Sequence, residues 1–573
     1  MTLSKRLVKE VVKVLNSLKI LKHENIEKTI EIPPNPELGD LASNICFSLS
    51  KKIKKAPKEL ADEIVSKIKI PKGSFIKKIE SKGGYINFFL DNSRIAKLIL
   101  KKILEKEERY GSSNLGRHRR VMVEFSQPNT NKPMHIGHAR NTALGDSLSR
   151  ILSFSGYDVI KANYFGDIGL HVAKSILGYL KWGRNLKPKK KPDHFVGDFY
   201  TKYYEEVKNN PELEEEAREI LRRWEKNDKR ILALWKKMRK WCLEGFKETY
   251  KRFGVSFDVY FFESQFEKIG KEIAKKVLEK GIAFKTDDGA VVADLEKHGL
   301  PSCVILRSDG TSLYSTKDLA LGIEKFEKYG IEKSIYVVGS EQKLYLKQIF
   351  KILELLGYKK AKDCYHLAYG LVMLPEGKMS SRKGTAVLLD NLLDELKELA
   401  YGIVSKNNPK MSEKEKNMIA ESVGLAALKY ALLKVSPEKN ILFDKKEVIQ
   451  FEGNTGPYLQ YAHTRCSSIL RKAGKHSVNL ENDNLTEEEN KLLMKLAEFP
   501  QTVELATKDL RPHYICSYAY DLATLFNEFY HKCPVIKAEP ESLRDFRLTL
   551  VKAVEIVLKI SLNLLGIKTL ERM

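Results

Sequence analysis

The sequence predicts a multidomain α/β protein with a split, Rossmann-like parallel sheet at its centre, an N-terminal α+β domain and a C-terminal all-α domain. Strand-like and helix-like patterns alternate from 120 to 164, and the same alternation returns from 334 to 356, as expected for two halves of one parallel sheet. After about residue 387 the pattern is mostly helical. The chain has 573 residues, which at about 150 residues per domain corresponds to roughly three to four domains.

The first expected domain covers residues 1–115. Helical patterns occupy 3–18 and 56–68, and the alternating run at 84–90 predicts a strand. The lysine-rich stretch at 51–58 fits a surface that follows a phosphate backbone or, more simply, a solvated helix face. We therefore expect a small α+β domain here.

The second expected domain covers 116–386 and contains both halves of the parallel sheet. Strands are expected at 121–125 and 157–164, with a helix between them. The second half begins with a strand at 334–338 and continues with a helix at about 341–356.

A long insertion at about 175–300 is expected to separate the two halves. It contains a lysine- and proline-rich run at 187–192, which predicts an exposed loop, and a charged helical stretch at about 212–250. Beyond the sheet, we expect linking helices at 387–455 and a helical domain at 456–573, with prolines marking the breaks between helices.

Charge and cysteine content narrow the function. The 100 Lys and Arg residues exceed the 75 Asp and Glu residues by 25, which favours a polyanionic partner, nucleic acid above all, although a lysine-rich surface gives the same surplus. No Cys-x-x-Cys pair occurs, so a structural zinc or disulfide framework is not expected. The sequence has neither a secretory leader pattern nor an apolar run of about 18 residues, which predicts a cytoplasmic protein without a membrane span.

The most informative motif lies between the first strand of the sheet and the helix that follows it. His135-Ile136-Gly137-His138 stands at an expected helix N-terminus, where unpaired N–H groups and the helix dipole attract anions. Two histidines can donate hydrogen bonds to phosphate oxygens, and Gly137 leaves room for a ring to lie against the backbone. The simpler interpretation is a capped helix with two surface histidines.

A second motif follows the second half of the sheet. Residues 377–384, Gly-Lys-Met-Ser-Ser-Arg-Lys-Gly, form a cation-rich loop bounded by glycines. Such a loop can neutralise charge on a departing pyrophosphate. Alone it would be an ordinary solvated loop, but paired with the histidine motif it indicates a nucleotide site.

These two motifs resemble the two signatures of class I aminoacyl-tRNA synthetases, and the chain as a whole resembles the arginyl-tRNA synthetase family. The resemblance extends to the segments at 124–129, 314–318, 453–465 and 564–567. It implies an ATP-dependent ligation of L-arginine to its cognate tRNA through an arginyl-adenylate. It also implies an N-terminal tRNA-binding domain, a Rossmann catalytic domain, a C-terminal helical anticodon-binding domain, a monomeric enzyme and, commonly, a need for bound tRNA before arginine is activated.

The resemblance assigns the ATP site residue by residue. It implies that His135 and His138 contact ATP and that Lys378 holds the phosphates, with Gly137, Ser380 and Lys383 also at the nucleotide. Mg²⁺ is expected to accompany ATP, and no zinc or other protein-bound metal site is expected. No nucleophilic Ser or Cys is needed, because such an enzyme orients reactants and stabilises charge.

The sequence departs from the family pattern at two places. Ser381 stands where a second lysine is usual in the loop, and Lys132 occupies the position of a lysine that the family uses in its place. Which of Lys132, Arg382 and Lys383 contacts the phosphates stays open. Further, Ile168 and His171 stand where Trp and Gln are usual, a difference from which no functional conclusion follows.

Arginine recognition requires carboxylates, because a guanidinium is a planar fork of donors that does not deprotonate. Tyr314 and Asp318 are four residues apart and share one face if the segment is helical. The resemblance makes Asp318 the guanidinium partner, whereas the local sequence also fits a capping box in which Asp318 only accepts a backbone N–H. The resemblance completes the pocket with Glu124, Asn129, His135 and Gln342.

In the last domain, Tyr458 and Tyr461 are three residues apart on one helical face and fit either stacking on anticodon bases or a place in the core. The resemblance favours base contacts and adds Met573.

Two alternatives to the whole assignment are another zinc-free class I synthetase, of the glutaminyl or cysteinyl type, and a catalytically idle RNA-binding relative. The set of Tyr314, Asp318 and Glu124 argues against the former, and intact His135, His138 and Lys378 against the latter.

Overall fold

The computed structural model describes residues 3–18, 25–373, 375 and 387–573. The N-terminal domain is a four-stranded antiparallel sheet in the order β1-β2-β4-β3 with three helices packed on it. The strands are β1 (Ile30–Glu31), β2 (Leu41–Ser43), β3 (Ile76–Lys82) and β4 (Tyr85–Leu90). The helices are α1 (Leu3–Asn16), α2 (Ile45–Ile53) and α3 (Pro57–Lys67). The expected α+β fold of this region is confirmed.

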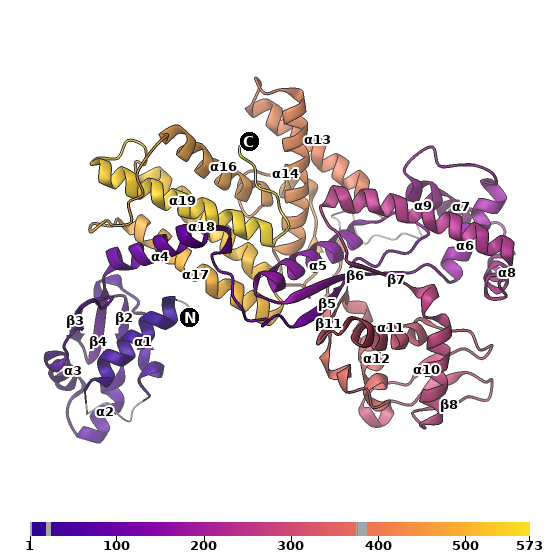
Figure 1. The fold of residues 1–573 in the computed structure, drawn as a ribbon, viewed down its shortest axis with the longest axis horizontal. Coiled ribbons are helices and arrows are strands. Elements are labelled where there is room, and N and C mark those ends of the chain that lie inside the picture. Colours follow the sequence, from indigo (N-terminus) through magenta and orange to yellow (C-terminus); the bar gives the residue numbers. More distant parts are fainter. Residues whose placement is uncertain (1–2, 19–24, 374, 376–386) are drawn as a thin grey trace.

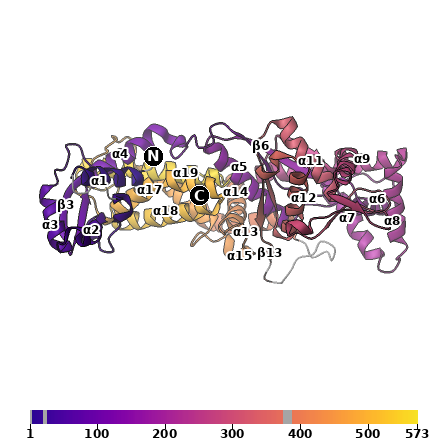
Figure 2. The same ribbon diagram turned by 90° about the horizontal axis from the view of Figure 1, so that it is seen from below.

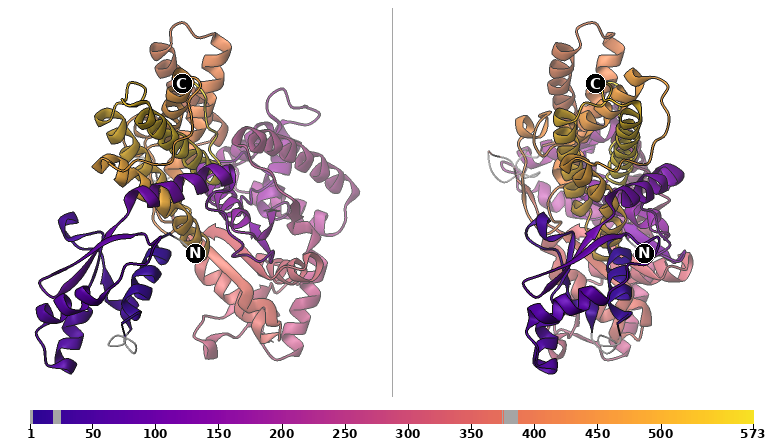
Figure 3. Two further views of the ribbon diagram at one scale, coloured as in Figure 1. Left: turned by 60° about the vertical axis from the view of Figure 1, so that its left-hand side comes forward. Right: turned by 90° about the vertical axis from the view of Figure 1, so that its left-hand side faces the viewer.

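Helix α4 (Asn92–Lys106) joins this domain to the rest of the chain and lies along the C-terminal helices (Figure 1). Just beyond it, the Tyr110 hydroxyl donates to the Leu496 carbonyl at 3.0 Å, and the Tyr110 ring stacks on Phe499 with centroids 6.1 Å apart. The N-terminal domain therefore projects to one side of the molecule while its linker is fixed to the C-terminal domain (Figure 3).

A five-stranded parallel sheet forms the centre of the molecule, in the order β12-β11-β5-β6-β7. Its strands are β5 (Arg120–Glu124), β6 (Asp158–Phe165), β7 (Val259–Phe262), β11 (Lys333–Gly339) and β12 (Cys364–Tyr369). Helix α5 (Ile136–Phe154) follows β5, and helix α12 (Lys343–Leu355) follows β11. The strand order reverses between β5 and β11, and ligands of such sheets bind at the carboxyl ends of the strands beside that point. The expected Rossmann-like sheet is confirmed.

The expected single insertion at 175–300 is wrong in one respect, because it contains β7, which pairs with β6 as a strand of the central sheet. One inserted unit, between β6 and β7, comprises α6 (Leu170–Trp182), α7 (Pro192–Glu206), α8 (Leu213–Glu225) and α9 (Lys229–Phe253). The other, between β7 and β11, comprises α10 (Glu267–Glu279), β8 (Ala283–Lys285), β9 (Val291–Ala293), β10 (Cys303–Leu306) and α11 (Tyr314–Tyr329). A four-residue strand has too short a pattern to be recognised between charged helices.

The helical stretch expected at 212–250 is likewise two helices, α8 and α9. The first ends at Glu225, and Asp228 caps the second, since its carboxylate accepts the backbone N–H groups of Arg230 and Ile231. Figure 2 shows the α6–α9 unit at the opposite end of the molecule from the N-terminal domain, with the sheet between them.

The remainder of the chain is helical, as expected. Its helices are α13 (Leu389–Asn407), α14 (Glu413–Leu433), α15 (Lys445–Val448), α16 (Gly456–Ala473), α17 (Glu487–Asp509), α18 (His513–Lys532) and α19 (Glu541–Leu564). A short parallel pair, β13 (Val372–Met373) and β14 (Ile441–Leu442), joins the region to the end of the central domain. In the described ranges, no helix has both the length and the apolar character that a membrane span requires.

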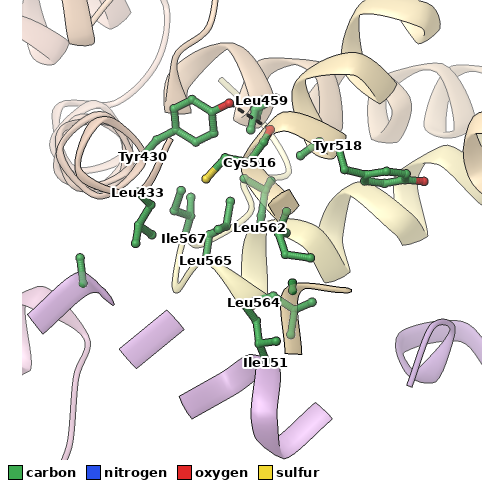
Figure 4. Packing of buried hydrophobic residues seen from close by; sticks show 14 of the residues in the cluster. Ile151, Tyr430, Leu433, Leu459, Cys516, Tyr518, Leu562, Leu564, Leu565 and Ile567 are labelled. Carbon is green, nitrogen blue, oxygen red and sulfur yellow. Dashed lines mark hydrogen bonds between the residues drawn. The ribbon is translucent and has the colours of Figure 1, made fainter. Parts of the chain in front are cut away.

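The C-terminal helices share a hydrophobic core with the central domain (Figure 4). Ile151 of α5 meets Leu564 at the end of α19, and Ser147 of α5 donates its hydroxyl to the Leu564 carbonyl at 2.9 Å. On the other side, α14 packs on α16 so closely that a Cβ at Gly456 would lie 2.2 Å from the Ala426 carbonyl oxygen. Helix α5 therefore supports the sheet and the C-terminal helices at once.

Candidate active site

A cavity of about 470 Å³ opens at the carboxyl ends of the parallel strands, beside the point where the strand order reverses. Five residues predicted to bind arginine line it: Glu124, Asn129, Tyr314, Asp318 and Gln342. Five further polar or aromatic residues that sequence reasoning missed also line it: Gln127, Tyr164, Glu263, Tyr336 and Tyr345. The fold thus gathers three carboxylates and several hydroxyl groups around one space.

Asp318 lies on α11 and faces the cavity. The Tyr345 hydroxyl donates a hydrogen bond to its Oδ2 at 2.6 Å. Burial raises the Asp318 pKa to about 6, opposed by the Tyr345 hydrogen bond. The capping-box interpretation of Asp318 is wrong. Helix α11 begins at Tyr314, and the Leu313 N–H, which precedes the helix, donates to Thr316 Oγ1 at 3.1 Å. Asp318 stands one turn inside the helix, where its side chain is available to a ligand.

Glu263 is a second acid of the cavity and follows directly after β7. It is 5% exposed, and its Oε2 lies 3.2 Å from Lys317 Nζ. Burial raises the Glu263 pKa to about 8, although the Lys317 ammonium acts in the opposite direction. The only signal for Glu263 in the sequence is its place after a strand, and the sequence did not reveal that strand.

Glu124, the third acid, ends strand β5 and is buried. Lys325 Nζ lies 2.5 Å from Glu124 Oε2, and Gln127 Nε2 donates to Glu124 Oε1 at 2.8 Å. Lys325 is fully buried and lies 3.7 Å from the centroid of the Tyr336 ring. The Glu124 charge is therefore balanced within the protein, whereas none of the described cations forms an ion pair with Asp318.

The remaining predicted pocket residues lie around the cavity. Asn129 forms an isolated parallel bridge with Gly166, and a Cβ at Gly166 would lie 2.1 Å from Asn129 Oδ1, so glycine is required for this approach. Tyr314, at the start of α11, is 52% exposed, and Gln342 lies exposed in the 3-10 turn after β11. These two residues mark the open side of the site.

The two histidines of the first motif lie at the N-terminus of α5, with ring centroids 3.9 Å apart. His135 Nδ1 accepts the Gly137 N–H at 3.2 Å, and His138 Nδ1 accepts the His135 N–H at 3.1 Å. Burial and nearby Lys132 lower the His135 pKa to about 4, and burial lowers the His138 pKa as well. Both rings are therefore neutral near pH 7 with the proton on Nε2, which is left to donate to an anion.

The second motif is placed only by its flanks. Lys378, Ser380, Arg382 and Lys383 lie outside the described residues. The chain immediately after them is bound to the first motif, since the Ile136 N–H donates to Val387 and the Leu389 N–H to Met134 at 3.1 and 2.9 Å. The described chain therefore resumes at residue 387 beside the start of α5.

The two positions that depart from the family pattern are both structural neighbours of this site. Ile168 is 5% exposed and packs in the protein interior. The His171 carbonyl accepts from Asn131 Nδ2 at 3.2 Å, and burial lowers the His171 pKa to about 4, with Lys132 adding to the effect. Nothing in these contacts assigns either side chain a role.

The predicted anticodon residues lie on α16. Tyr461 is 36% exposed, and the Arg465 guanidinium lies 4.6 Å from its ring centroid and 5.5 Å from that of Tyr530. Tyr458 is half-buried, and its hydroxyl accepts from Asn527 Nδ2 at 2.8 Å. Tyr461 thus lies on the surface, as base stacking would require, whereas Tyr458 lies partly in the core. Met573 is partly buried and packs against the core.

One cluster of potential metal ligands occurs among the residues that the structure describes, at Asp193, His194 and Asp390. Lys191 Nζ already lies 2.8 Å from Asp390 Oδ2, 3.1 Å from Asp193 Oδ2 and 2.6 Å from Thr249 Oγ1. Residues 187–192 were expected to form an exposed loop, but Lys191 is only partly exposed, because its ammonium pairs with Asp193 in the first turn of α7 and with Asp390 of α13. The cluster holds a lysine in the position that a cation would take.

A parallel sheet with a capped His-x-Gly-His turn after one strand, and an acid-lined cavity at its switch point, defines a class I aminoacyl-tRNA synthetase. Comparison with known families agrees: the family described as "tRNA synthetases class I (R), catalytic domain" matches residues 99–445. The "Arginyl tRNA synthetase N terminal domain" matches 5–90, and the "DALR anticodon binding domain" matches 459–573. The chain belongs to the arginyl-tRNA synthetase family.

Individual relatives extend over the whole chain. The arginine–tRNA ligase of Treponema denticola is 43% identical, with 95% of this chain and 94% of that protein covered. The arginine–tRNA ligase of Clostridium perfringens is 40% identical, with 99% and 100% covered. Among solved structures, Thermus thermophilus arginyl-tRNA synthetase superposes with a TM-score of 0.78 at 29% identity, covering 99% of this chain and 100% of that chain.

Proposed function

We propose that this protein attaches L-arginine to its cognate tRNA in two steps. The arginine carboxylate attacks the α-phosphorus of ATP and releases pyrophosphate, and the terminal ribose of the tRNA then takes the arginyl group from the adenylate and releases AMP. The observation that carries the proposal is the acid-lined cavity, in which Asp318 faces a space also lined by Gln127 and Asn129 of the loop that leads to the capped histidine turn. Family membership supports the same reaction.

Arginine recognition is assigned to the cavity. Asp318 and Glu263 offer carboxylates to the guanidinium, and Tyr345 fixes the orientation of the first. We assign Asn129, Tyr314 and Gln342 to contacts with the rest of the amino acid, and His135 to the side of the nucleotide. Glu124, already paired with Lys325, contributes mainly by holding Gln127 and Tyr336 in the wall.

ATP recognition is assigned to the N-terminus of α5. The Nε2–H groups of His135 and His138 donate to phosphate oxygens, while Gly137 gives the nucleotide access to the backbone, since a Cβ there would lie 3.0 Å from the His135 ring. Cations then stabilise the charge that develops on the leaving pyrophosphate. For this role we propose Lys378 with Lys132 and Lys383, and we propose that Ser380 binds the nucleotide beside them. Mg²⁺ is expected to enter with ATP, and we assign it no protein ligand.

Transfer RNA is assigned to the flanking domains. We propose that the exposed Tyr461–Arg465 pair stacks on anticodon bases, with Tyr458 and Met573 beside it, and that the domain at 1–115 contacts the body of the tRNA. We expect the enzyme to act as a monomer. All seven cysteines are free thiols, as is typical of a reducing compartment, and we expect it to act in the cytoplasm.

The test is aminoacylation of tRNA transcripts with labelled amino acids. The proposal expects charging of the arginine tRNA with arginine, and none with citrulline, which has the same shape without the charge. Equal charging with citrulline or lysine would refute the role of the acids. Tight tRNA binding without charging would instead support the RNA-binding alternative.

A further inference from the structure

Arg140 is a fully buried arginine in helix α5, five residues after His135. Its guanidinium donates to four backbone carbonyls: Gly370 at 2.6 Å, Leu371 at 3.1 Å, Pro437 at 2.9 Å and Lys439 at 2.6 Å. Within the described part of the chain, no carboxylate forms an ion pair with it. A buried charge satisfied only by carbonyl groups is costly to desolvate, so its presence calls for a physical explanation.

The four carbonyls belong to two chain segments that run side by side. Gly370 and Leu371 lead into the segment that carries Lys378, while Pro437 and Lys439 precede β14. Asn440 Oδ1 also accepts the Leu371 N–H at 2.8 Å, and a Cβ at Gly370 would lie 2.7 Å from that oxygen. The two segments are thus tied to each other and, through Arg140, to α5.

The same helix also holds the chain where it leaves the second motif. Residues 387–389 bond to 134–136 at the N-terminus of α5, as described above. Consequently one rigid helix contacts the chain both before and after the segment that contains Lys378, and it carries the two histidines at its end. The hydrogen bonds before that segment come from side chains, those of Arg140 to the 370 and 371 carbonyls and that of Asn141 Nδ2 to the Tyr369 hydroxyl at 3.2 Å, whereas those after it are between backbone groups.

The segment at 436–439 is fixed from its far side as well. Arg511, between α17 and α18, donates to Ser436 Oγ at 3.0 Å and forms an ion pair with Glu438. The Arg140 junction therefore lies between the helix of the first motif, the approach to the second motif and the C-terminal domain.

We propose that Arg140 is a positioning residue for the ATP reaction: its four hydrogen bonds set the position of the chain at 370–371 relative to the two histidines of α5. This inference rests on the proposed function. Arg140 does not line the arginine cavity, so its loss should slow adenylate formation without weakening arginine recognition. A lysine has the same charge but lacks the planar fork, and cannot serve four carbonyls in two segments.

The experiment measures arginine-dependent ATP–pyrophosphate exchange in the presence of tRNA, with rates expressed per active site from the adenylate burst. For Arg140→Lys we expect kcat to fall roughly 10- to 100-fold and the KM for ATP to rise, while the KM for arginine stays within about twofold. A role in folding alone would reduce the number of active sites and leave both constants unchanged.

The matched control is Arg547→Lys. Arg547 is another buried arginine, bonded to Glu489 and to the Pro534 carbonyl in the C-terminal domain. We expect this variant to lower the melting temperature with kcat per active site near that of the unmodified protein. If Arg140→Lys behaves as Arg547→Lys does, the positioning role is overturned.

A second pair of variants tests the junction from its exposed side, in case Arg140→Lys does not fold. Asn440→Ala removes the acceptor of the Leu371 N–H and should lower kcat about threefold, whereas Asn440→Asp keeps an oxygen there and should restore most of the rate. Equal rates for Asn440→Ala and the unmodified protein would overturn the inference. If the unmodified protein shows no arginine-dependent exchange, the proposed function fails and this inference fails with it.

Discussion

The Tyr345 hydroxyl donates to the Asp318 carboxylate at 2.6 Å, and this bond joins helix α12 to helix α11 across the wall of the arginine cavity. Tyr345 follows β11 and Asp318 precedes it, so the strand places both ends of the bond. The bond fixes Oδ2 of an acid that lines the cavity, where a carboxylate can pair with a guanidinium.

Removing that hydroxyl should loosen the acid without changing its charge. We expect Tyr345→Phe to reduce kcat/KM for arginine about tenfold, because a hydrogen bond to a charged group contributes about 1.5 kcal/mol. Steady-state exchange kinetics provide the measurement. Tyr358→Phe is the control, since within the described ranges the Tyr358 hydroxyl has a single hydrogen bond, to the Ile323 carbonyl at 3.4 Å. Equal effects of the two changes would mean that the bond has no role in recognition.

Removing the charge itself should be more severe. We expect Asp318→Asn to reduce kcat/KM for arginine by over 100-fold, because a guanidinium left without its carboxylate in a buried site costs about 3 kcal/mol or more. The affinity for tRNA should be unchanged, which filter binding can check. Asp363→Asn, at a surface ion pair with Lys360, serves as the control. A loss below about fivefold would assign guanidinium recognition elsewhere.

The two raised pKa values predict a pH dependence of arginine recognition. Asp318 has a pKa of about 6 and Glu263 of about 8, and each must lose its proton to attract a guanidinium. We therefore expect kcat/KM for arginine to rise with pH, steeply below about pH 6 and more gently up to about pH 8. The pKa of His135 is about 4, so that ring does not titrate in this range.

The Glu263→Gln variant separates the two acids. It should remove the upper part of the rise and leave the part below about pH 6 in place. A profile that is flat between about pH 5 and pH 8 in the unmodified protein would contradict the assignment of both acids.

At the C-terminal surface, the two tyrosines of α16 should respond differently to alanine. Tyr461→Ala should raise the KM for tRNA about tenfold at an unchanged melting temperature, because one base stack contributes about 1.5 kcal/mol. Tyr458→Ala should lower the melting temperature, since it removes the hydrogen bond with Asn527 and the contact with Tyr520, whose ring centroid is 5.8 Å away. Should Tyr461→Ala unfold the domain, that tyrosine is a core residue after all.

Much of the fold follows from local pattern, as the sheet shows. Strands at β5, β6 and β11 have apolar runs bounded by polar turns, and their spacing with helices predicts a parallel arrangement. Strand β7 has only four residues and could not be predicted from the sequence. Glu263 was missed with it, because Glu263 reaches the pocket only through the place of β7 in the sheet.

Site residues could be predicted from the sequence where their partners are close in sequence, and could not where their partners are distant. Asp318 and His135 could be predicted because their neighbours in sequence, Tyr314 and Gly137, are also their neighbours in space. Arg140 could not, because an arginine in a helix is ordinarily a surface residue, and its partners lie 230 or more positions away. Interactions between distant segments leave no periodic pattern in the sequence.

In the proposed reaction, the acid-lined cavity binds the arginine that is activated with ATP. The most direct measurement is ATP–pyrophosphate exchange with arginine or lysine, each with and without cognate tRNA. We expect exchange with arginine when tRNA is present, and none with lysine. Absence of exchange under every condition, or equal exchange with lysine, would contradict it.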